Sequence, residues 1–164
     1  MHRLVGYHRP GSIADAVELL HAPDRMALAG GTTFVHDRGA EPVEVVDLQA
    51  LGLDDIAVPG EPGERAGHGD RVRIGATVTL LAVCRHAAIP DLVRQCATAE
   101  LPSTLRSLAT VGGTVAAAEP GSVLLAALLV HEAVVGFADG RTEPLGTVLR
   151  DGVGPGSLVV DVTV

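Results

Sequence analysis

The first clear pattern along the chain is a helical spacing of apolar residues near its start. These positions, three or four residues apart, are Ile13, Ala16, Val17 and Leu20. Ser12 followed by Asp15 is typical of a capping box, which satisfies the free N–H groups at the beginning of a helix. Pro23 has no backbone N–H and ends a helical pattern. The sequence therefore predicts a helix that begins at Ser12 and ends before Pro23.

Short apolar runs elsewhere in the chain predict β-strands, because each is bounded by turn-forming residues. The predicted strands cover residues 26–29, 43–48, 56–58, 71–76, 111–115 and 158–164. Residues 133–145 are typical of a β-hairpin, since two apolar segments flank Asp139-Gly140. Further helices are predicted from Thr79 to residue 86, from Asp91 to about residue 98, and from Ser122 onward.

Helices and strands are mixed rather than regularly alternating, which favours an α+β fold in two lobes. We expect an N-terminal lobe over residues 1–54 and a second, larger lobe over residues 55–164. Residues 59–70 are rich in Pro and Gly and predict a surface loop in the second lobe.

Composition narrows the class of protein. The 164 residues are 47% hydrophobic but only 2% aromatic, so the core must be built from Ala, Val and Leu. A net charge of −8 and the absence of Trp disfavour nucleic-acid binding, because phosphates would be repelled and bases would find little to stack on. The longest apolar run, residues 123–130, is too short to span a membrane. With no signal-peptide pattern and two cysteines, Cys84 and Cys96, we expect a cytoplasmic protein.

Two glycine-rich segments carry the candidate chemistry, Leu28-Ala29-Gly30-Gly31-Thr32-Thr33 and Thr110-Val111-Gly112-Gly113-Thr114. Glycine allows positive φ and lets a ligand approach the bare backbone. Successive N–H groups in such a turn form a concave site for an anion. Each segment alone also fits a simple tight turn, but two of them suggest a long ligand held at two places, such as a dinucleotide.

The order and spacing of several motifs resemble the FAD-binding domain of the molybdenum hydroxylase family, which includes the flavin subunit of aerobic carbon monoxide dehydrogenase and the middle part of xanthine dehydrogenase. Besides the two Gly-Gly segments, the motifs are Tyr7-His8-Arg9-Pro10-Gly11-Ser12, Leu19-Leu20, Val46-Asp47-Leu48, Arg73-Ile74-Gly75-Ala76-Thr77, Leu105-Arg106-Ser107, Pro120 and Leu124-Leu125. The resemblance runs from Tyr7 to Val164 and implies a two-lobed fold of the p-cresol methylhydroxylase type. A small βαβ lobe would pack on a larger lobe with an antiparallel sheet and flanking helices, with FAD in the cleft between them.

The resemblance also implies roles for individual residues. The first Gly-Gly turn would hold the FAD pyrophosphate through Ala29, Gly30, Gly31, Thr32 and Thr33. The second turn would lie along the flavin ring and ribityl chain through Thr110, Val111, Gly112, Gly113 and Thr114. Arg106 matches a family arginine and would place positive charge near the cofactor, although a surface arginine is the alternative interpretation. His8, within the first motif, is a candidate flavin neighbour.

Four departures separate this chain from the family pattern. Thr114 stands where Asn or Asp is usual, and Ala117-Ala118-Glu119-Pro120 stands where Asn-Ala-Ser-Pro is usual. Val123 aligns with a family Asp that hydrogen-bonds FAD, and from the resemblance we expect the chain to lack the family's C-terminal domain. Glu119 would bring negative charge toward the flavin and so disfavour an anionic reduced flavin. Alternatively, Glu119 is a candidate catalytic acid or base. The seven histidines show no metal-ligand spacing, so no metal site is predicted.

Three functions follow from these observations. The first is a flavin electron-transfer module that works with iron–sulfur and molybdenum subunits. The second is a stand-alone enzyme that acts on a small organic substrate, with Glu119 as acid or base. The third is a docking subunit that has lost FAD. A homo-oligomer stays open in each case, and neither a nucleic-acid nor a membrane partner is expected.

Overall fold

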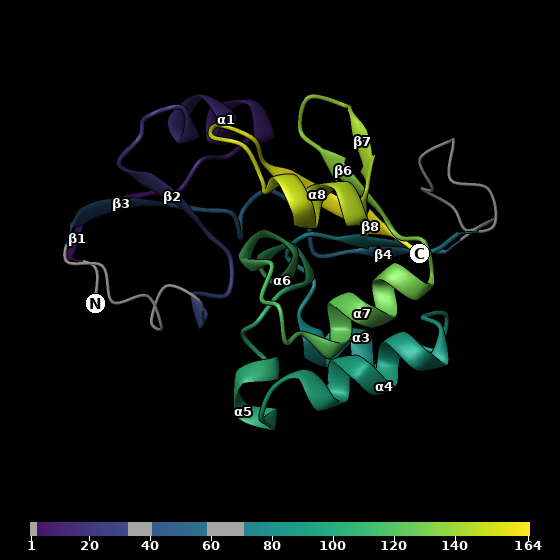
Figure 1. Cartoon of the computed structure of the whole chain (residues 1–164). Helices are drawn as coiled ribbons and strands as arrows, with labels where there is room; N and C mark the ends of the chain where they lie inside the picture. The colour runs from purple at the N-terminus through teal and green to yellow at the C-terminus, as the bar shows by residue number, and fades with distance from the viewer. Residues whose placement is uncertain (1–2, 33–40, 59–70) are drawn as a thin grey trace.

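The computed structural model describes residues 3–32, 41–58 and 71–164, and contains two β-sheets with helices around them (Figure 1). The first sheet is three-stranded, in the order β1-β3-β2, and all its pairings are parallel. Its strands are β1 (Arg3–His8), β2 (Arg25–Leu28) and β3 (Pro42–Asp47). Helix α1 (Ile13–Leu20) connects β1 to β2 and packs on this sheet. The predicted βαβ unit is confirmed, and β1 is a strand that the sequence pattern had not indicated.

The second sheet is five-stranded and antiparallel, in the order β4-β5-β8-β6-β7. Its strands are β4 (Ile56–Ala57), β5 (Arg73–Gly75), β6 (Val134–Phe137), β7 (Thr142–Pro144) and β8 (Val159–Thr163). The predicted hairpin is the β6–β7 pair, whose register places Val135 opposite Glu143. The predicted α+β class, with one parallel and one antiparallel sheet, is confirmed.

Six helices of the described chain follow β5. They are α3 (Leu80–Arg85), α4 (Asp91–Glu100), α5 (Ser103–Arg106), α6 (Val111–Ala117), α7 (Val123–Val130) and α8 (Leu145–Asp151). The predicted starts at Thr79 and Ser122 are confirmed, because each side chain accepts a hydrogen bond from the backbone N–H three residues later. Helix α8 was not predicted, and the predicted hairpin overlaps it only at Leu145.

The strand predicted over residues 111–115 is wrong, because this segment forms helix α6. The hydroxyl of Thr110 accepts a hydrogen bond from the N–H of Gly113 at 3.1 Å and caps the helix. Gly112 packs so closely on Ala76 that a Cβ at Gly112 would lie 2.8 Å from the Ala76 carbonyl oxygen. A two-glycine segment has little helix propensity, so this cap and this packing decide its conformation.

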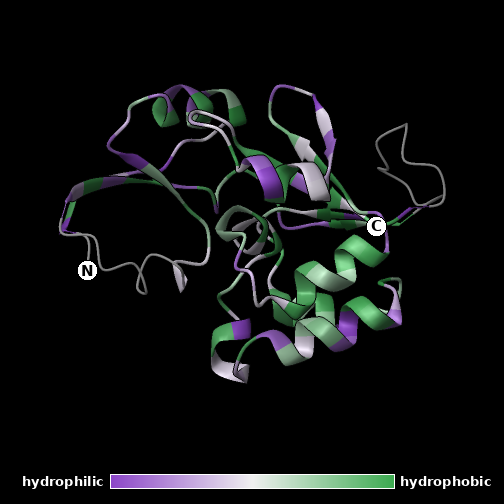
Figure 2. Cartoon of the chain, in the orientation of Figure 1, coloured by the Kyte–Doolittle hydropathy of each residue, from purple (hydrophilic) through white to green (hydrophobic). Residues whose placement is uncertain are grey.

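One hydrophobic core runs through both sheets. From the first sheet and α1 it includes Ala16, Val46 and Leu48, and from the second sheet it includes Ile74 and Val162. Helix α7 is apolar on all sides, with Leu124 and Leu128 in this core (Figure 2). The two sheets lie on either side of position 54 in the sequence, and the division into lobes at that position stays a prediction. None of the described helices has the length and apolar content needed to cross a bilayer.

Candidate functional site

The two Gly-Gly turns line the same pocket, which has a volume of about 240 Å³. We call it the turn pocket. The first turn follows strand β2, and the second begins helix α6. Another wall comes from the segment before β8, at Val153, Ser157 and Leu158. No Arg, Lys, His, Asp or Glu of the described residues lines the pocket. The fold thus brings together two segments that lie far apart in sequence, at a site to which the described residues contribute no charged side chain.

The two glycines of the first turn have different structural roles. Gly31 has a φ of +71°, a conformation that side chains other than glycine rarely adopt. Gly30 has an ordinary φ, but a Cβ at this position would lie 1.8 Å from the carbonyl oxygen of Leu108. Leu108 comes two residues before Thr110, so the first turn packs directly on the segment that leads into the second turn. Gly30 therefore holds the two turns together, and Gly31 shapes the turn itself.

The first turn has backbone donors to spare, whereas both glycines of the second turn use theirs. Within the described part of the chain, no hydrogen bond uses the N–H groups of Gly30, Gly31 or Thr32. In the second turn, the N–H of Gly112 donates to the Ala76 carbonyl at 2.9 Å, and that of Gly113 donates to the Thr110 hydroxyl. An anion therefore fits the first turn, where backbone N–H groups can donate to it. On the other side of the pocket, Gly112 and Gly113 are joined by Ala116 and Ala117 of the same helix.

Most of the predicted binding residues line the turn pocket, but some do not. Those that do are Ala29, Gly30, Gly31, Thr32, Thr110, Gly112 and Gly113. Val111 is buried in the core, and the Thr114 hydroxyl donates to the Thr110 carbonyl at 3.0 Å. Thr33 lies outside the described residues. Their assignment to FAD binding stays a prediction.

Arg106 and Glu119 do not line the turn pocket. The Arg106 guanidinium donates to the carbonyl oxygens of Thr98 and Leu101, at 2.6 and 2.7 Å, and so caps the end of α4. Glu119 is exposed just after α6, and Val123, at the start of α7, is 42% exposed. The two hydrogen bonds of Arg106 thus give it a structural role at the end of α4.

A polar network at the carboxyl end of the parallel sheet supports the first turn. Asp47 is buried, and its carboxylate accepts hydrogen bonds from the Tyr7 hydroxyl and, at 2.9 Å, from the Gln49 N–H. The Leu48 N–H donates to the Leu28 carbonyl at 2.9 Å, which fixes the point where β2 enters the turn. The hydrogen bond to Asp47 raises the pKa of Tyr7 above its usual value. The carboxyl ends of parallel strands are a common place for ligands, and here they position the Gly-Gly turn.

His8 belongs to the structure of the first sheet. Its Nε2 lies 2.8 Å from Glu44 Oε2, and Arg25 Nε also lies 2.8 Å from that oxygen. These two hydrogen bonds lower the pKa of Glu44, with that from His8 contributing most. No cluster of three metal-ligating side chains occurs among the residues that the structure describes.

The sequence analysis missed the C-terminal wall of the pocket. Val153, Ser157, Leu158 and Val159 all line it. The signal for this wall was the run Gly152-Val153-Gly154-Pro155-Gly156, in which Gly152 and Gly156 have positive φ values of 78° and 72°. A glycine at every second position is typical of a segment whose backbone turns sharply or approaches a ligand closely.

Ala118 ends α6 in a left-handed conformation, with a φ of 47°. This conformation is unfavourable for residues with a Cβ. We expect Ala118→Gly to raise the free energy of unfolding by about 0.5–1 kcal/mol, measured by urea denaturation. Ala126→Gly, within α7, is the matched control and should lower it by about 1 kcal/mol. Equal destabilisation by both variants would contradict a strained Ala118.

Known proteins are similar to this chain in sequence and in fold. The chain matches the family model described as the FAD binding domain in molybdopterin dehydrogenase over residues 3–162. It is 35% identical over 124 residues to the carbon monoxide dehydrogenase medium chain of Afipia carboxidovorans, which covers 71% of this chain and 40% of that protein. Among solved structures, it is similar to CO dehydrogenase from Oligotropha carboxidovorans, with a TM-score of 0.81 and 28% identity over 97% of this chain and 58% of that one.

A third comparison shows the fold alone. The structure of quinoline 2-oxidoreductase from Pseudomonas putida 86 aligns with a TM-score of 0.82 at 21% identity, over 97% of this chain and 58% of that one. The chain thus spans about 40% to 60% of the length of the relatives that it matches. The family match covers nearly the whole chain, and this protein therefore belongs to the family of FAD-binding domains of molybdopterin dehydrogenases, whose cofactor is FAD.

Proposed function

We propose that this chain is the flavin electron-transfer module of a molybdenum hydroxylase-type oxidoreductase. The observation that carries the proposal is the turn pocket, which both Gly-Gly turns line and in which the N–H groups of Gly30, Gly31 and Thr32 donate to no described residue. The related medium chain comes from a carbon monoxide dehydrogenase, and a similar solved structure is a Cu,Mo-CO dehydrogenase. We infer that the partners of this chain are iron–sulfur and molybdenum subunits.

The residues of the turn pocket suit the middle of an FAD molecule. The N–H groups of Gly30, Gly31 and Thr32 would donate to the pyrophosphate, which needs no cation there. Gly112 and Gly113 would lie against the ribityl chain and the flavin ring. The pocket's volume of about 240 Å³ is below the ~300–1,000 Å³ of typical ligand sites, so both ends of the dinucleotide would extend beyond it.

Bound FAD would supply the redox chemistry by accepting and releasing electrons. The protein's part is to hold and orient it. Apolar residues of the wall, such as Leu28, Leu48 and Leu158, would keep water away from the bound group. No described acidic or basic side chain reaches into the pocket, so the site fits electron transfer better than acid–base chemistry on a substrate.

We expect the purified protein to retain FAD, and not FMN, after reconstitution and desalting. FMN lacks the adenosine half and has a single phosphate, so it cannot bridge from the flavin surface to the first turn and beyond. Flavin absorbance of the desalted protein and calorimetric titration measure the difference. Colourless protein without calorimetric binding of FAD would overturn the proposed function.

Glu119→Gln should leave FAD affinity and the rates of flavin photoreduction and reoxidation within about twofold of the wild type. The side chain is exposed and lies outside the turn pocket, so loss of its proton-carrying group changes nothing near the flavin. A stand-alone enzyme that used Glu119 as acid or base would lose roughly a hundredfold in turnover. Turnover of a small substrate without any partner subunit would replace the electron-transfer proposal with the stand-alone one.

A further inference from the structure

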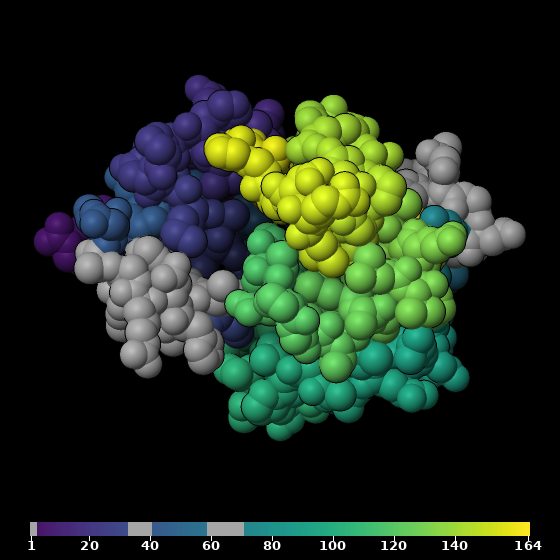
Figure 3. All heavy atoms as spheres, in the orientation of Figure 1, coloured from purple at the N-terminus to yellow at the C-terminus, as the bar shows by residue number. Residues whose placement is uncertain are grey.

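The segment of residues 152–158, between α8 and β8, forms one wall of the turn pocket and touches both halves of the molecule. We call it the wall segment. Val153, Ser157 and Leu158 line the pocket. At its other side, Gly156 lies against α1, since a Cβ there would be 3.4 Å from the His21 ring. Figure 3 shows this yellow segment against the purple N-terminal part of the chain. The position of the wall segment therefore sets the width of the pocket on this side.

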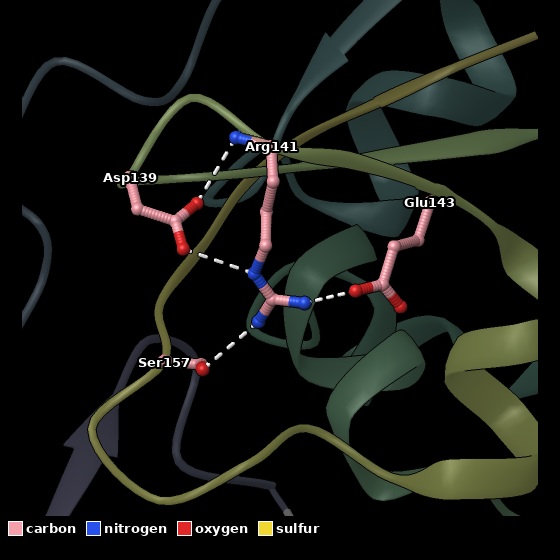
Figure 4. Close-up of polar contacts among 4 residues, drawn as sticks. All are labelled: Asp139, Arg141, Glu143 and Ser157. Atoms are coloured by element: carbon pink, nitrogen blue, oxygen red, sulfur yellow. Dashed lines mark hydrogen bonds and ion pairs between the residues drawn. The ribbon is translucent and has the colours of Figure 1, made fainter.

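Arg141, in the turn of the β6–β7 hairpin, holds the wall segment from outside the pocket (Figure 4). Its Nη2 donates to the Ser157 hydroxyl at 3.0 Å, and its Nε donates to Asp139 Oδ2 at 3.0 Å. Its Nη1 pairs with Glu143, and the guanidinium lies 3.8 Å from the centre of the Phe137 ring. Two carboxylates and an aromatic face thus hold the guanidinium in an orientation in which Nη2 points at Ser157.

The Arg141–Ser157 hydrogen bond is the side-chain link between the hairpin and the wall segment. The backbone adds a link at the far end, where the Ala138 N–H donates to the Leu158 carbonyl at 2.9 Å. Only arginine has a planar fork that can serve two carboxylates and a hydroxyl at once. Asp139 and Glu143 keep the arginine in place, so the hydrogen bond that it donates to the Ser157 hydroxyl is its contribution to the wall of the pocket.

We propose that Arg141 is a positioning residue of the FAD pocket, which acts through Ser157 to fix the wall segment against the bound cofactor. The inference rests on the proposed binding of FAD in the turn pocket. Arg141 itself does not line the pocket. Its effect should therefore appear in how tightly the pocket retains FAD and in the environment of the flavin.

The test compares FAD release from the wild type with that from Arg141→Met, which keeps an apolar stem over Phe137 but loses every donor. We expect the dissociation rate to rise about threefold to tenfold, as for the loss of one hydrogen bond. The visible circular-dichroism signal of bound flavin should also weaken. Arg141→Lys, which retains one donor, should recover part of both. Arg85→Met, an exposed position on α3, makes the same change in charge and should release FAD as the wild type does.

A double variant tests whether Arg141 acts through Ser157. If it does, Arg141→Met with Ser157→Ala should release FAD no faster than the faster of the two single variants. Rates that multiply would overturn the inference, as would an Arg141→Met protein with the wild-type rate and spectrum.

Amide hydrogen exchange separates this inference from the proposed function. In the protein without FAD, Arg141→Met should speed exchange in the wall segment, and unchanged exchange there would overturn the inference. A wild type that binds no FAD would overturn the proposed function and, with it, the role of Arg141 toward FAD. The exchange result would then decide only whether Arg141 fixes the wall segment through Ser157.

Discussion

Gly31→Val should abolish FAD binding, with affinity at least about a hundredfold below that of the wild type. At a φ of +71°, a β-branched residue is strongly disfavoured, so the turn must rotate to relieve the strain. That rotation would turn the N–H groups of Gly31 and Thr32 away from the pyrophosphate. Each hydrogen bond to a charged group is worth about 1.5–3 kcal/mol, and about 1.4 kcal/mol corresponds to tenfold in affinity. Calorimetric titration with FAD measures the loss.

Gly52→Val is the matched control for Gly31→Val. Gly52 has a φ of +64°, is exposed and has nothing within 4 Å of an added Cβ. The same backbone strain should lower the stability of both variants, while only Gly31→Val should lose FAD. A folded Gly31→Val protein with wild-type affinity would remove the first turn from the binding site.

Gly30→Ala should lower the free energy of unfolding by about 3 kcal/mol or more. The added methyl would meet the Leu108 carbonyl oxygen at 1.8 Å, and both partners are backbone, so the clash is relieved only if the two turns move apart. Overpacking usually costs about 1–3 kcal/mol, and a clash between two backbone segments lies at the upper end. Since a domain is stable by only about 5–15 kcal/mol, the loss is readily measured by urea denaturation.

Gly121→Ala provides the comparison for Gly30→Ala. Nothing lies within 4 Å of a Cβ at Gly121, and its φ is not in the left-handed range. Its stability should stay within about 0.5 kcal/mol of the wild type. A Gly30→Ala protein equally close to the wild type would show that the two turns are not packed together at Gly30.

These two variants separate two explanations for the first Gly-Gly turn. The sequence predicted that both glycines let a ligand approach the backbone. In the structure, only Gly31 has room for an added atom, with the Leu28 side chain 3.4 Å away, whereas Gly30 already meets protein. Gly30→Ala should therefore lose FAD through loss of structure, and Gly31→Val should lose it in a folded protein.

The sequence by itself determined the elements whose hydrogen bonds are local. Helices α1, α3 and α7 begin where Ser12, Thr79 and Ser122 cap them, and each cap bonds a residue only three positions away. The β6–β7 hairpin was predictable for the same reason, because its strands are joined by a short turn at Asp139-Gly140. The two glycine-rich segments could be recognised from the local sequence alone, and both line the turn pocket.

Tertiary structure decided the elements and contacts that depend on distant partners. Strand β1 has no clear alternation, and it forms because β3 supplies its hydrogen bonds. The sequence pattern of the segment beginning at Val111 predicts a strand, yet the segment is a helix because Ala76 lies against Gly112. Two further contacts depend on distant partners: Gly30 packs on Leu108, and Arg141 donates a hydrogen bond to Ser157. No local sequence pattern predicts either contact. A helix cap needs only residues within one helical turn of each other, whereas the walls of the pocket form only when long-range packing brings distant segments together.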